Sequence, residues 1–399
     1  MSEPISRIVV IGGGQAAGWA CKTLREEGFG GTLTVVADEP HDFYERPPLS
    51  KAVLSGDASL PRLFPEDDVA GWSIDWRRPK RATHIDSHAH TVTLDDGERL
   101  AYDRLLIATG ATPRLPDPRW AEHDDVLTLR SWDDAQRLKR RLADARRLAV
   151  VGGGWIGLEV AATARRLGLE VEVFERQAAL CARSVGPEVS EALAALHLRE
   201  NVALRLNCGD VAITPLASGV RITSDVHDTQ ADLAVVGTGV DFGLELAREA
   251  GVATQQGIVV DQAGATSVAD IFAAGDVTQH PVLGQCLQSW GYAQNQAIAA
   301  ARGLLGKAAA YDDPAWLWSD QYGTNIQILG TPCPDTRCVV RQEPLGTSFF
   351  YLDAADRLCQ AVTFDQPRHI KLAKRWLAAR RVLDPDMLGD PTSNLMRLR

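Results

Sequence analysis

Two glycine-rich segments have the residue types and spacing that bind phosphate. Residues 12–17 read GGGQAA and fit G-x-G-x-x-A, and residues 152–157 read GGGWIG and fit G-x-G-x-x-G. Glycines allow a tight turn and let the backbone approach a pyrophosphate closely. The start of a following helix adds free amide groups and partial positive charge. Each segment therefore predicts a dinucleotide site.

An acidic residue follows each glycine segment where a ribose would be bound. Asp38 ends the strand after the first helix, and Glu175 closes the corresponding strand after the second. A carboxylate there accepts hydrogen bonds from ribose hydroxyls, and Glu175 would repel a 2′-phosphate, which favours NADH over NADPH. Arg176, directly after Glu175, works against this preference. One glycine segment alone is weak support, but two with the same context and an acid each argue against ligand-free turns.

The elements around the two segments repeat in the same order. Residues 7–12 are an apolar strand, and the first glycine segment leads into a helix and a second strand at residues 32–38. The order begins again at residues 147–152, and a separation of about 140 residues fits two similar domains rather than a solenoid. Two dinucleotide sites in one chain imply electron transfer between a bound flavin and an exchanging nicotinamide.

The other segments predict a hairpin, a crossover and a third domain. Residues 96–97 are an Asp-Gly turn between two strand-like runs. Residues 113–124 are rich in proline and polar residues, which is typical of a crossover between domains. A long helix is predicted at residues 288–306. After it, alternating strand-like runs precede a basic helix at residues 370–383.

Composition limits the classes of function. The length of 399 residues predicts two or three domains rather than one core. The net charge of -10 argues against general nucleic-acid binding. No apolar run is long enough to predict a membrane span, and the N-terminal segment lacks the features of a signal peptide, so we expect a cytoplasmic protein. The seven cysteines are scattered without a CxxC pair or a completed zinc-ligand set, which predicts free thiols and no metal.

Motifs along the chain resemble those of a known flavoprotein family. The sequences IATGATPR at residues 107–114, VVGTGV at 235–240 and IFAAGDV at 271–277 are similar to FAD/NAD(P)-dependent pyridine nucleotide oxidoreductases. More narrowly, YERPPLSK, TLRS, QSW, AQNQ and PAWLWSDQYGTNIQILG resemble the ferredoxin reductase component of bacterial aromatic-ring dioxygenase systems and of some P450 systems. The resemblance covers nearly the whole chain, with the motifs in the same order.

The resemblance implies an α/β fold with two Rossmann-like dinucleotide-binding domains, as in glutathione reductase, and a small C-terminal α+β domain. The implied boundaries are residues 1–112 and 244–313 for a discontinuous FAD-binding domain, 113–243 for the NAD-binding domain and 314–399 for the C-terminal domain. The implied activity is that of an FAD-dependent NADH:ferredoxin oxidoreductase of the EC 1.18.1 type. In such an enzyme FAD takes a hydride from NADH, and single electrons pass to a [2Fe-2S] ferredoxin that feeds an oxygenase, here an aromatic-ring dioxygenase.

The resemblance also implies roles for individual residues. The implied FAD contacts are Gly12, Gly14, Ala16, Ala17, Asp38, Arg46, Lys51, Ala82, Thr109, Gly110, Arg130, Gly275, Asp276 and Trp290. The implied NADH contacts are Gly152, Gly154, Trp155, Ile156, Gly157, Glu175 and Gly239. One departure is Gln288, where the family often has glutamate, and the loss of that charge would raise the flavin potential.

Lys51 and Glu159 are the expected catalytic pair. Lys51 follows the adjacent prolines Pro47 and Pro48, which lack backbone donors and predict a short helix start beside the flavin. We expect Lys51 to pair with Glu159 and to stabilise negative charge on the reduced flavin. The alternative for Glu159 is an ordinary solvated acid on its helix.

Two features are candidates for ferredoxin docking, at Lys371, Lys374, Arg375, Trp316 and Trp318. The tryptophans lie two residues apart and would share one face of a strand, either at the flavin edge or in the core of the third domain. The cations would steer an acidic ferredoxin, or they form a solvated helix face. The basic segment at residues 77–81 competes for the same role.

Residues 41–54 hold no cysteine where disulfide reductases of the same superfamily carry a redox pair. Electrons would therefore leave the flavin for an external acceptor. One alternative function is an NADH oxidase or monodehydroascorbate-type reductase that uses a small acceptor. Another is a redox-sensing flavoprotein. We expect a monomer or a homodimer.

Overall fold

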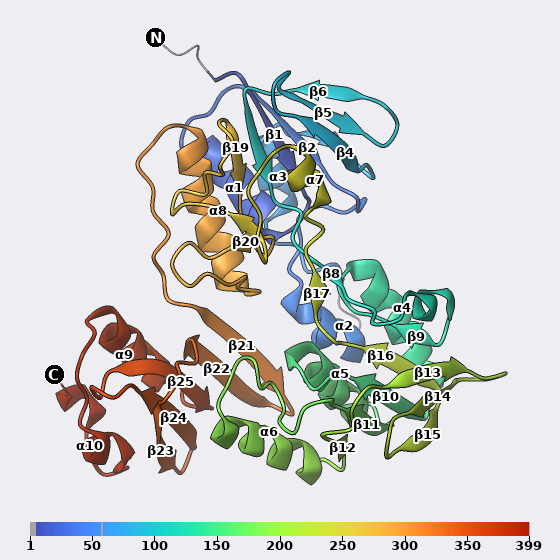
Figure 1. Ribbon diagram of the computed structural model, residues 1–399, viewed down its shortest axis with the longest axis vertical. Helices are drawn as coiled ribbons and strands as arrows, with labels where there is room; N and C mark the ends of the chain where they lie inside the picture. The colour runs from blue at the N-terminus through green and yellow to red at the C-terminus, as the bar shows by residue number, and fades with distance from the viewer. Residues whose placement is uncertain (1–4, 57–58, 399) are drawn as a thin grey trace. The chain divides into compact units, whose positions relative to one another are not determined.

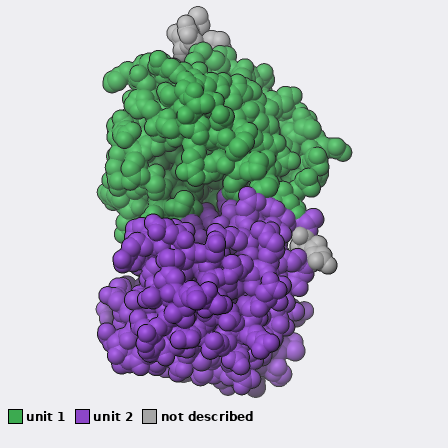
Figure 2. Space-filling view, turned by 90° about the vertical axis from the view of Figure 1, so that its right-hand side faces the viewer, with its two compact units in different colours: residues 1–45, 60–112, 241–313 green, residues 46–59, 113–240, 314–399 purple. Residues whose placement is uncertain are grey.

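The computed structural model describes residues 5–56 and 59–398. The chain divides into two compact units, shown in different colours in Figure 2. The first comprises residues 1–45, 60–112 and 241–313, and the second comprises residues 46–59, 113–240 and 314–399. The chain passes from one unit to the other at β8 (Thr112–Pro113) and β17 (Val240–Asp241), among other points. The domain boundaries expected from the sequence stay a prediction.

The first unit is built on a five-stranded parallel sheet in the order β19-β7-β1-β2-β3 (Figure 1). Its strands are β1 (Arg7–Ile11), β2 (Thr32–Val36), β3 (Asp75–Arg77), β7 (Arg104–Ile107) and β19 (Ile271–Ala273). The other elements of this unit are α1 (Gln15–Glu26), α3 (Glu66–Gly71), β4 (Ala82–Asp86), β5 (Thr91–Leu94), β6 (Arg99–Ala101), α7 (Glu245–Glu249), β18 (Ile258–Val259), β20 (Thr278–Gln279) and α8 (Trp290–Leu304).

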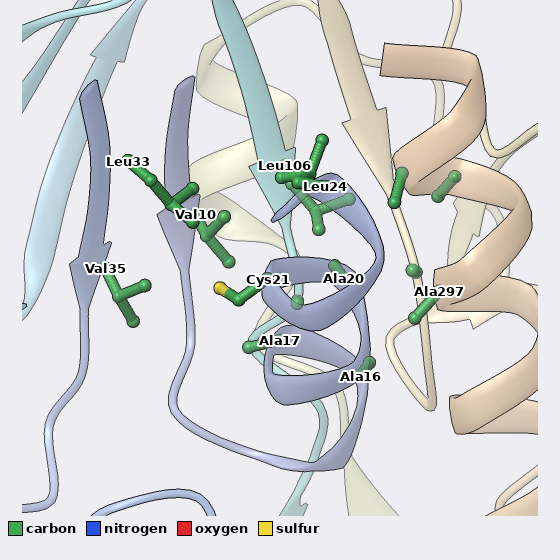
Figure 3. Close-up of a cluster of buried hydrophobic side chains, with 14 of the residues drawn as sticks. Val10, Ala16, Ala17, Ala20, Cys21, Leu24, Leu33, Val35, Leu106 and Ala297 are labelled. Atoms are coloured by element: carbon green, nitrogen blue, oxygen red, sulfur yellow. The ribbon is translucent and has the colours of Figure 1, made fainter. Parts of the chain in front are cut away.

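Both faces of this sheet are covered, which explains why its strands are continuous apolar runs. Ile8 and Val10 of β1 pack in one core with α1 and α8, whereas Val9 and Ile11 pack in another with β4, β5 and α7. Figure 3 shows the first of these cores, where α1 presents Ala17 and other small side chains. Small residues let α1 lie close to the sheet. The helix begins at Gln15, directly after the glycine turn that follows β1.

The second unit contains a second five-stranded parallel sheet in the order β12-β11-β10-β16-β9 (Figure 1). Its strands are β9 (Val126–Leu127), β10 (Arg147–Val151), β11 (Glu170–Phe174), β12 (Ala203–Arg205) and β16 (Leu233–Val236). Around it lie η1 (Pro47–Ser50), α2 (Ala52–Ser55), η2 (Pro118–Glu122), α4 (Trp132–Asp144), α5 (Trp155–Arg166), α6 (Pro187–Arg199), β13 (Ala212–Pro215), β14 (Val220–Thr223) and β15 (Asp228–Ala231).

The last part of the second unit is an antiparallel sheet in the order β21-β22-β25-β24-β23. Its elements are β21 (Trp316–Gln321), β22 (Thr324–Gly330), β23 (Arg337–Glu343), β24 (Gly346–Leu352), β25 (Leu358–Phe364), α9 (Pro367–Ala378), α10 (Pro385–Gly389) and η3 (Leu395–Arg397). One face of this sheet packs against α9 and the C-terminal segment through Phe350, Ala373 and Trp376.

Local expectations from the sequence are confirmed in most elements. The Asp-Gly turn joins β5 to β6 in an antiparallel pair, and Gly97 has the positive φ (+87°) that such a turn needs. The long helix is α8, capped by the Ser289 side chain. The basic helix begins at Pro367 and ends at Ala378, so it is displaced toward the N-terminus because Pro367 supplies a good first helical residue. Within residues 5–56 and 59–398, no helix is long and apolar enough to cross a membrane.

Candidate functional site

The first glycine turn follows β1 and has no room for side chains. Gly12 has φ +127°, and a Cβ added there would lie 2.2 Å from the carbonyl oxygen of Ala108. The turn leads into α1, whose Ala16 and Ala17 are buried. The carboxamide of Gln15, at the start of α1, is shielded from solvent, yet neither its oxygen nor its nitrogen has a hydrogen-bond partner. A helix start with an unpartnered amide beside it fits a bound pyrophosphate.

Three parallel strands bring the other expected FAD residues of the first unit to the same edge of the sheet. Ile11, Ile107 and Ala273 end β1, β7 and β19 and lie in register. The residues that follow them are therefore neighbours at this edge, as ligand-binding loops are in parallel sheets. They include Thr109, Gly110, Gly275 and Asp276.

The Gly275 turn packs directly against the start of α1. A Cβ at Gly275, which has φ +84°, would lie 2.8 Å from the Cβ of Ala16. The amide of Gly275 donates to Gln296 Oε1 at 2.8 Å, and the Thr278 hydroxyl donates to the same oxygen at 2.8 Å. Trp290 begins α8, the helix that carries Gln296. Sequence reasoning missed Gln296, which lies six residues beyond Trp290 on the same helix.

Asp38 is exposed and lies two residues after the end of β2. A carboxylate that accepts hydrogen bonds from ribose hydroxyls has to be exposed in this way. The Asp38 carboxylate pairs with Arg81 at 3.3 Å, and Ala82 follows Arg81 at the start of β4. The pairing between residues 38 and 81 was not visible in the sequence. It assigns Arg81 to the expected adenosine end of this site, beside Ala82.

The second glycine turn, between β10 and α5, repeats the geometry of the first. A Cβ at Gly152 (φ +113°) would lie 2.5 Å from the Gly237 carbonyl oxygen, and one at Gly157 would lie 2.2 Å from the Gly152 carbonyl oxygen. Gly154, in contrast, faces open space. The indole nitrogen of Trp155 is shielded from solvent without a partner, and Ile156 is 46% exposed. The close approaches at Gly152 and Gly157 fix the backbone of the turn, and the open space at Gly154 fits a dinucleotide.

Glu175 is held beside this turn by backbone amides. Its carboxylate accepts from the Gly153 amide at 2.7 Å and from the Gln177 amide at 2.8 Å. The neighbouring Arg176 is exposed and lies 3.7 Å from Asp210. Gly239, with φ +114°, approaches the guanidinium of Arg183, since a Cβ there would lie 3.7 Å from Nη2. Arg183 was not expected from the sequence.

The segment with the two prolines forms a short helix start, as the sequence predicts. Pro47 and Pro48 begin η1, and Lys51 lies between η1 and α2. The Lys51 ammonium is 2.7 Å from Glu159 Oε2 and donates to the Pro47 carbonyl at 3.1 Å. The ion pair with Glu159 is therefore present, and Glu159 is 3% exposed, so it is no solvated acid. Its catalytic role stays a prediction.

Glu159 has two further partners that sequence reasoning missed. The Ser50 hydroxyl donates to Oε2, and the Ser319 hydroxyl donates to Oε1 at 2.7 Å. Thr163, one turn beyond Glu159 on α5, donates to the Ser50 carbonyl at 2.7 Å. A buried carboxylate needs such donors, because each unpaired oxygen would cost a large desolvation free energy.

Arg46 and Arg130 lie together in the second unit. Arg46 Nη1 donates to the Arg130 carbonyl at 2.6 Å. The backbone amide of Arg130 donates to Asp134, which closes the capping box of α4. Local capping therefore fixes the backbone of Arg130, and Arg130 in turn fixes Arg46.

The surface residues expected to meet a partner lie on β21 and α9. Trp316 and Trp318 stack with ring centroids 5.2 Å apart on β21. Lys371, Lys374 and Arg375 are exposed on α9, while Ala373 and Trp376 of the same helix are buried.

The competing basic segment at residues 77–81 has its charges compensated. Arg77 pairs with Glu98 at 2.9 Å, Arg78 with Asp42 at 2.7 Å, and Lys80 with Asp96 at 2.7 Å. These acids weaken the positive field of the segment at residues 77–81.

All seven cysteines are free thiols. Burial raises the pKa of Cys21 to about 12 and that of Cys181 well above its usual value, so both thiols are poor nucleophiles at neutral pH. In the described part of the chain, no group of three or more His, Cys, Asp or Glu residues could hold a metal ion.

Comparison with known proteins identifies the class. The pyridine nucleotide-disulphide oxidoreductase family matches residues 6–297, and the reductase C-terminal family matches residues 316–399. The chain therefore belongs to the pyridine nucleotide-disulphide oxidoreductase family and has the fold of its FAD- and NAD-dependent reductases, with a C-terminal domain.

The relatives define a narrower group. The ferredoxin–NAD(+) reductase component of the p-cumate 2,3-dioxygenase system of Pseudomonas putida is 38% identical over 98% of both chains. The corresponding component of the anthranilate 1,2-dioxygenase system of Burkholderia cepacia is 39% identical over 97% of this chain and 98% of its own. The structure of the covalent putidaredoxin reductase–putidaredoxin complex matches with a TM-score of 0.92 and 31% identity over 99% of this chain and 98% of that chain.

Proposed function

We propose that this protein is an FAD-dependent NADH:ferredoxin reductase that supplies electrons to an oxygenase, in particular an aromatic-ring dioxygenase. The observation that carries the proposal is the presence of two separate glycine turns, each followed by a helix, a parallel strand and an acid, in a chain whose cysteines are all free thiols. The relatives from the p-cumate and anthranilate systems align over 98% of their own length and carry this activity in their names. The free thiols fit a reducing compartment, and the cytoplasm is the location we propose.

The first unit supplies most of the FAD contacts. Gly12, Gly14 and the start of α1 bind the pyrophosphate, and Asp38 binds the adenosine ribose. The other residues proposed to contact FAD are Ala16, Ala17, Ala82, Thr109, Gly110, Gly275, Asp276, Trp290, Arg46, Lys51 and Arg130. When bound, FAD accepts a hydride from NADH and releases electrons one at a time.

The second unit binds NADH. Gly152, Gly154 and Gly157 accommodate the pyrophosphate, and Trp155, Ile156 and Gly239 border it. Glu175 accepts hydrogen bonds from the adenosine ribose. Its carboxylate is fixed by backbone amides, so it cannot turn away from a 2′-phosphate, which explains a preference for NADH.

Lys51 places a positive charge beside the flavin. Its ammonium is oriented by Glu159 and by the Pro47 carbonyl, and a fixed charge of this kind stabilises negative charge that develops on a reduced ring. Replacing Lys51 with Met should slow the reduction of FAD by NADH in stopped-flow experiments, and reduction at the wild-type rate would contradict this role.

The ferredoxin partner is a [2Fe-2S] protein that docks near the Trp316–Trp318 stack and the α9 cations Lys371, Lys374 and Arg375. Acidic ferredoxins are attracted to exposed cations, and such steering weakens as salt screens the charges. The stacked indoles are partly buried, with Trp316 packed against the C-terminal core, and their exposed parts add an apolar contact.

The test measures NADH-dependent cytochrome c reduction with and without a [2Fe-2S] ferredoxin. Efficient reduction only with ferredoxin, with a rate that falls steeply with salt, supports the proposal. Rapid turnover with oxygen or a small quinone and no gain from ferredoxin would refute it. Lys371→Glu should raise the KM for ferredoxin about tenfold without changing ferricyanide reduction, whereas Arg140→Glu, at an exposed position on α4, serves as the matched control.

A further inference from the structure

A chain of hydrogen bonds leads from Glu159 through the interior of the second unit. Ser319 Oγ donates to Glu159 Oε1 at 2.7 Å, and Gln321 Nε2 donates to Ser319 Oγ at 3.0 Å. His197 Nε2 lies 2.7 Å from Gln321 Oε1, and the Tyr322 hydroxyl lies 3.0 Å from His197 Nδ1. The chain joins α5, α6 and the end of β21, which are distant in sequence.

The protons of this chain have one arrangement. A carboxylate only accepts, so Ser319 donates its single hydroxyl proton to Glu159 and accepts from the amide nitrogen of Gln321. The Gln321 oxygen then faces His197 and also only accepts, so His197 carries its proton on Nε2. His197 Nδ1 accepts the proton of Tyr322. If the Gln321 amide were turned over, Ser319 would have to donate twice.

All donors of the chain therefore point toward Glu159. The exposed fraction is 3% at Glu159, 1% at Gln321 and 0% at Ser319 and His197. Water cannot replace a lost partner at these positions, so each bond fixes the next. Burial also lowers the pKa of His197 to about 4, which keeps the ring in the neutral form that the chain requires.

The two carboxylate oxygens of Glu159 have different partners. Oε1 is tied to Ser319, which leaves Oε2 facing Ser50 and the Lys51 ammonium. Without Gln321, the Ser319 hydroxyl would lose its own donor and could rotate away from Glu159. The carboxylate would then be free to turn, and Lys51 would lose its fixed partner.

We propose that Gln321 and His197 are positioning residues for Lys51, because they hold Glu159 in the orientation that fixes the Lys51 ammonium. This inference rests on the proposed function, since it needs Lys51 beside the flavin. Neither Gln321 nor His197 touches Lys51, so both act through Ser319 and Glu159.

The experiment compares FAD-loaded Gln321→Met with Lys51→Met and the double variant. Met keeps the length of Gln but removes the donor to Ser319 and the acceptor for His197. Gln321→Met should lower the limiting rate of flavin reduction by NADH about tenfold, within the roughly hundredfold loss that a 1 Å misplacement can cause, and it should leave the NADH dissociation constant unchanged. The double variant should be no slower than Lys51→Met alone.

A matched control comes from the same antiparallel sheet. Gln360 on β25 is 1% exposed and donates to the Ser184 carbonyl at 2.9 Å. It is not a member of the hydrogen-bond chain that leads to Glu159. Gln360→Met should reduce flavin at the wild-type rate. Equal rates for Gln321→Met and Gln360→Met would overturn the inference, and so would a full tenfold further loss in the double variant. Wild-type reduction by Lys51→Met would overturn the role of Lys51 as well, which separates the two failures.

A second variant at position 321 and one measurement on the wild-type protein extend the test. Gln321→Glu keeps the size and the acceptor for His197 but lacks the donor to Ser319, so the same fall in rate is expected, and wild-type reduction would contradict it. Nitrogen NMR of ¹⁵N-histidine-labelled holoprotein should find His197 with its proton on Nε2 at pH 7. A proton on Nδ1 would reverse the chain and overturn the inference.

Discussion

His197 should make the folded protein less stable as the pH falls from 7 to 5, and His197→Gln should remove that part of the pH dependence. The ring is fully buried between Gln321 and Tyr322. Burial lowers its pKa from 6.5 to about 4. The unfolded chain therefore takes up a proton at a higher pH than the folded protein does.

The sign and size follow from this difference. Between pH 6.5 and pH 4 the unfolded state binds more protons at His197, so the free energy of unfolding falls as the pH falls. The contribution of His197 is fully present above pH 6.5 and is lost progressively toward pH 4. The loss from this one residue is about 2 kcal/mol between pH 7 and pH 5 and about 3 kcal/mol by pH 4.

The assay is urea unfolding of the wild-type protein and His197→Gln at pH 7 and pH 5, with a fixed excess of FAD. Burial also lowers the pKa of His280 and of His369, so the wild-type curve alone mixes several groups. The difference between the two proteins isolates His197, and it should change by about 2 kcal/mol between the two pH values. His88→Gln, at an exposed position after β4, controls for the loss of a histidine as such.

Equal pH dependence in the wild-type protein and His197→Gln would refute the reasoning. It would mean that His197 takes up a proton in the folded state as readily as in the unfolded chain. The hydrogen bond from Tyr322 to Nδ1 would then be absent at pH 5. The assignment of donors and acceptors along the buried hydrogen-bond chain would be wrong.

Three other substitutions test the cofactor sites. Gly12→Ala places a methyl group against the Ala108 carbonyl and should weaken FAD binding about tenfold or more, measured as flavin content; full loading would argue against the turn as an FAD site. Glu175→Ala should lower the ratio of kcat/KM for NADH to that for NADPH about tenfold, and an unchanged ratio would remove Glu175 from cofactor choice. Gln288→Glu should lower the flavin midpoint potential, because added negative charge disfavours the reduced anion; an unchanged potential would end this idea.

The two dinucleotide turns could be predicted from the sequence because their requirements are local. A glycine that must have a positive φ, such as Gly12 or Gly152, lies within a few residues of the strand and helix that it joins. Apolar runs and helical periodicity identify those elements without any knowledge of the partners. The acids Asp38 and Glu175 follow at fixed distances along the chain, so their place beside the turns was also predictable.

Lys51 and Glu159 could be predicted only in part from the sequence. Neither belongs to a local pattern, and a family resemblance pointed to Lys51 while the need of a buried charge for a partner suggested Glu159. The structure supplied the 2.7 Å separation and the burial of Glu159. Composition could not decide whether that helix acid was buried or solvated.

Only the tertiary structure decided what surrounds Glu159. Its partners Ser50 and Ser319 lie 109 and 160 residues away in the sequence, and the bond between His197 and Gln321 spans 124 residues. Serine, glutamine and histidine are common polar residues with no motif around these positions. They form a directed chain because packing of α5, α6 and β21 excludes water, so each donor must find its acceptor within the protein. The sequence predicted where the phosphates of the cofactors would be held, and the packed interior determined how Lys51, the predicted catalytic residue, is oriented.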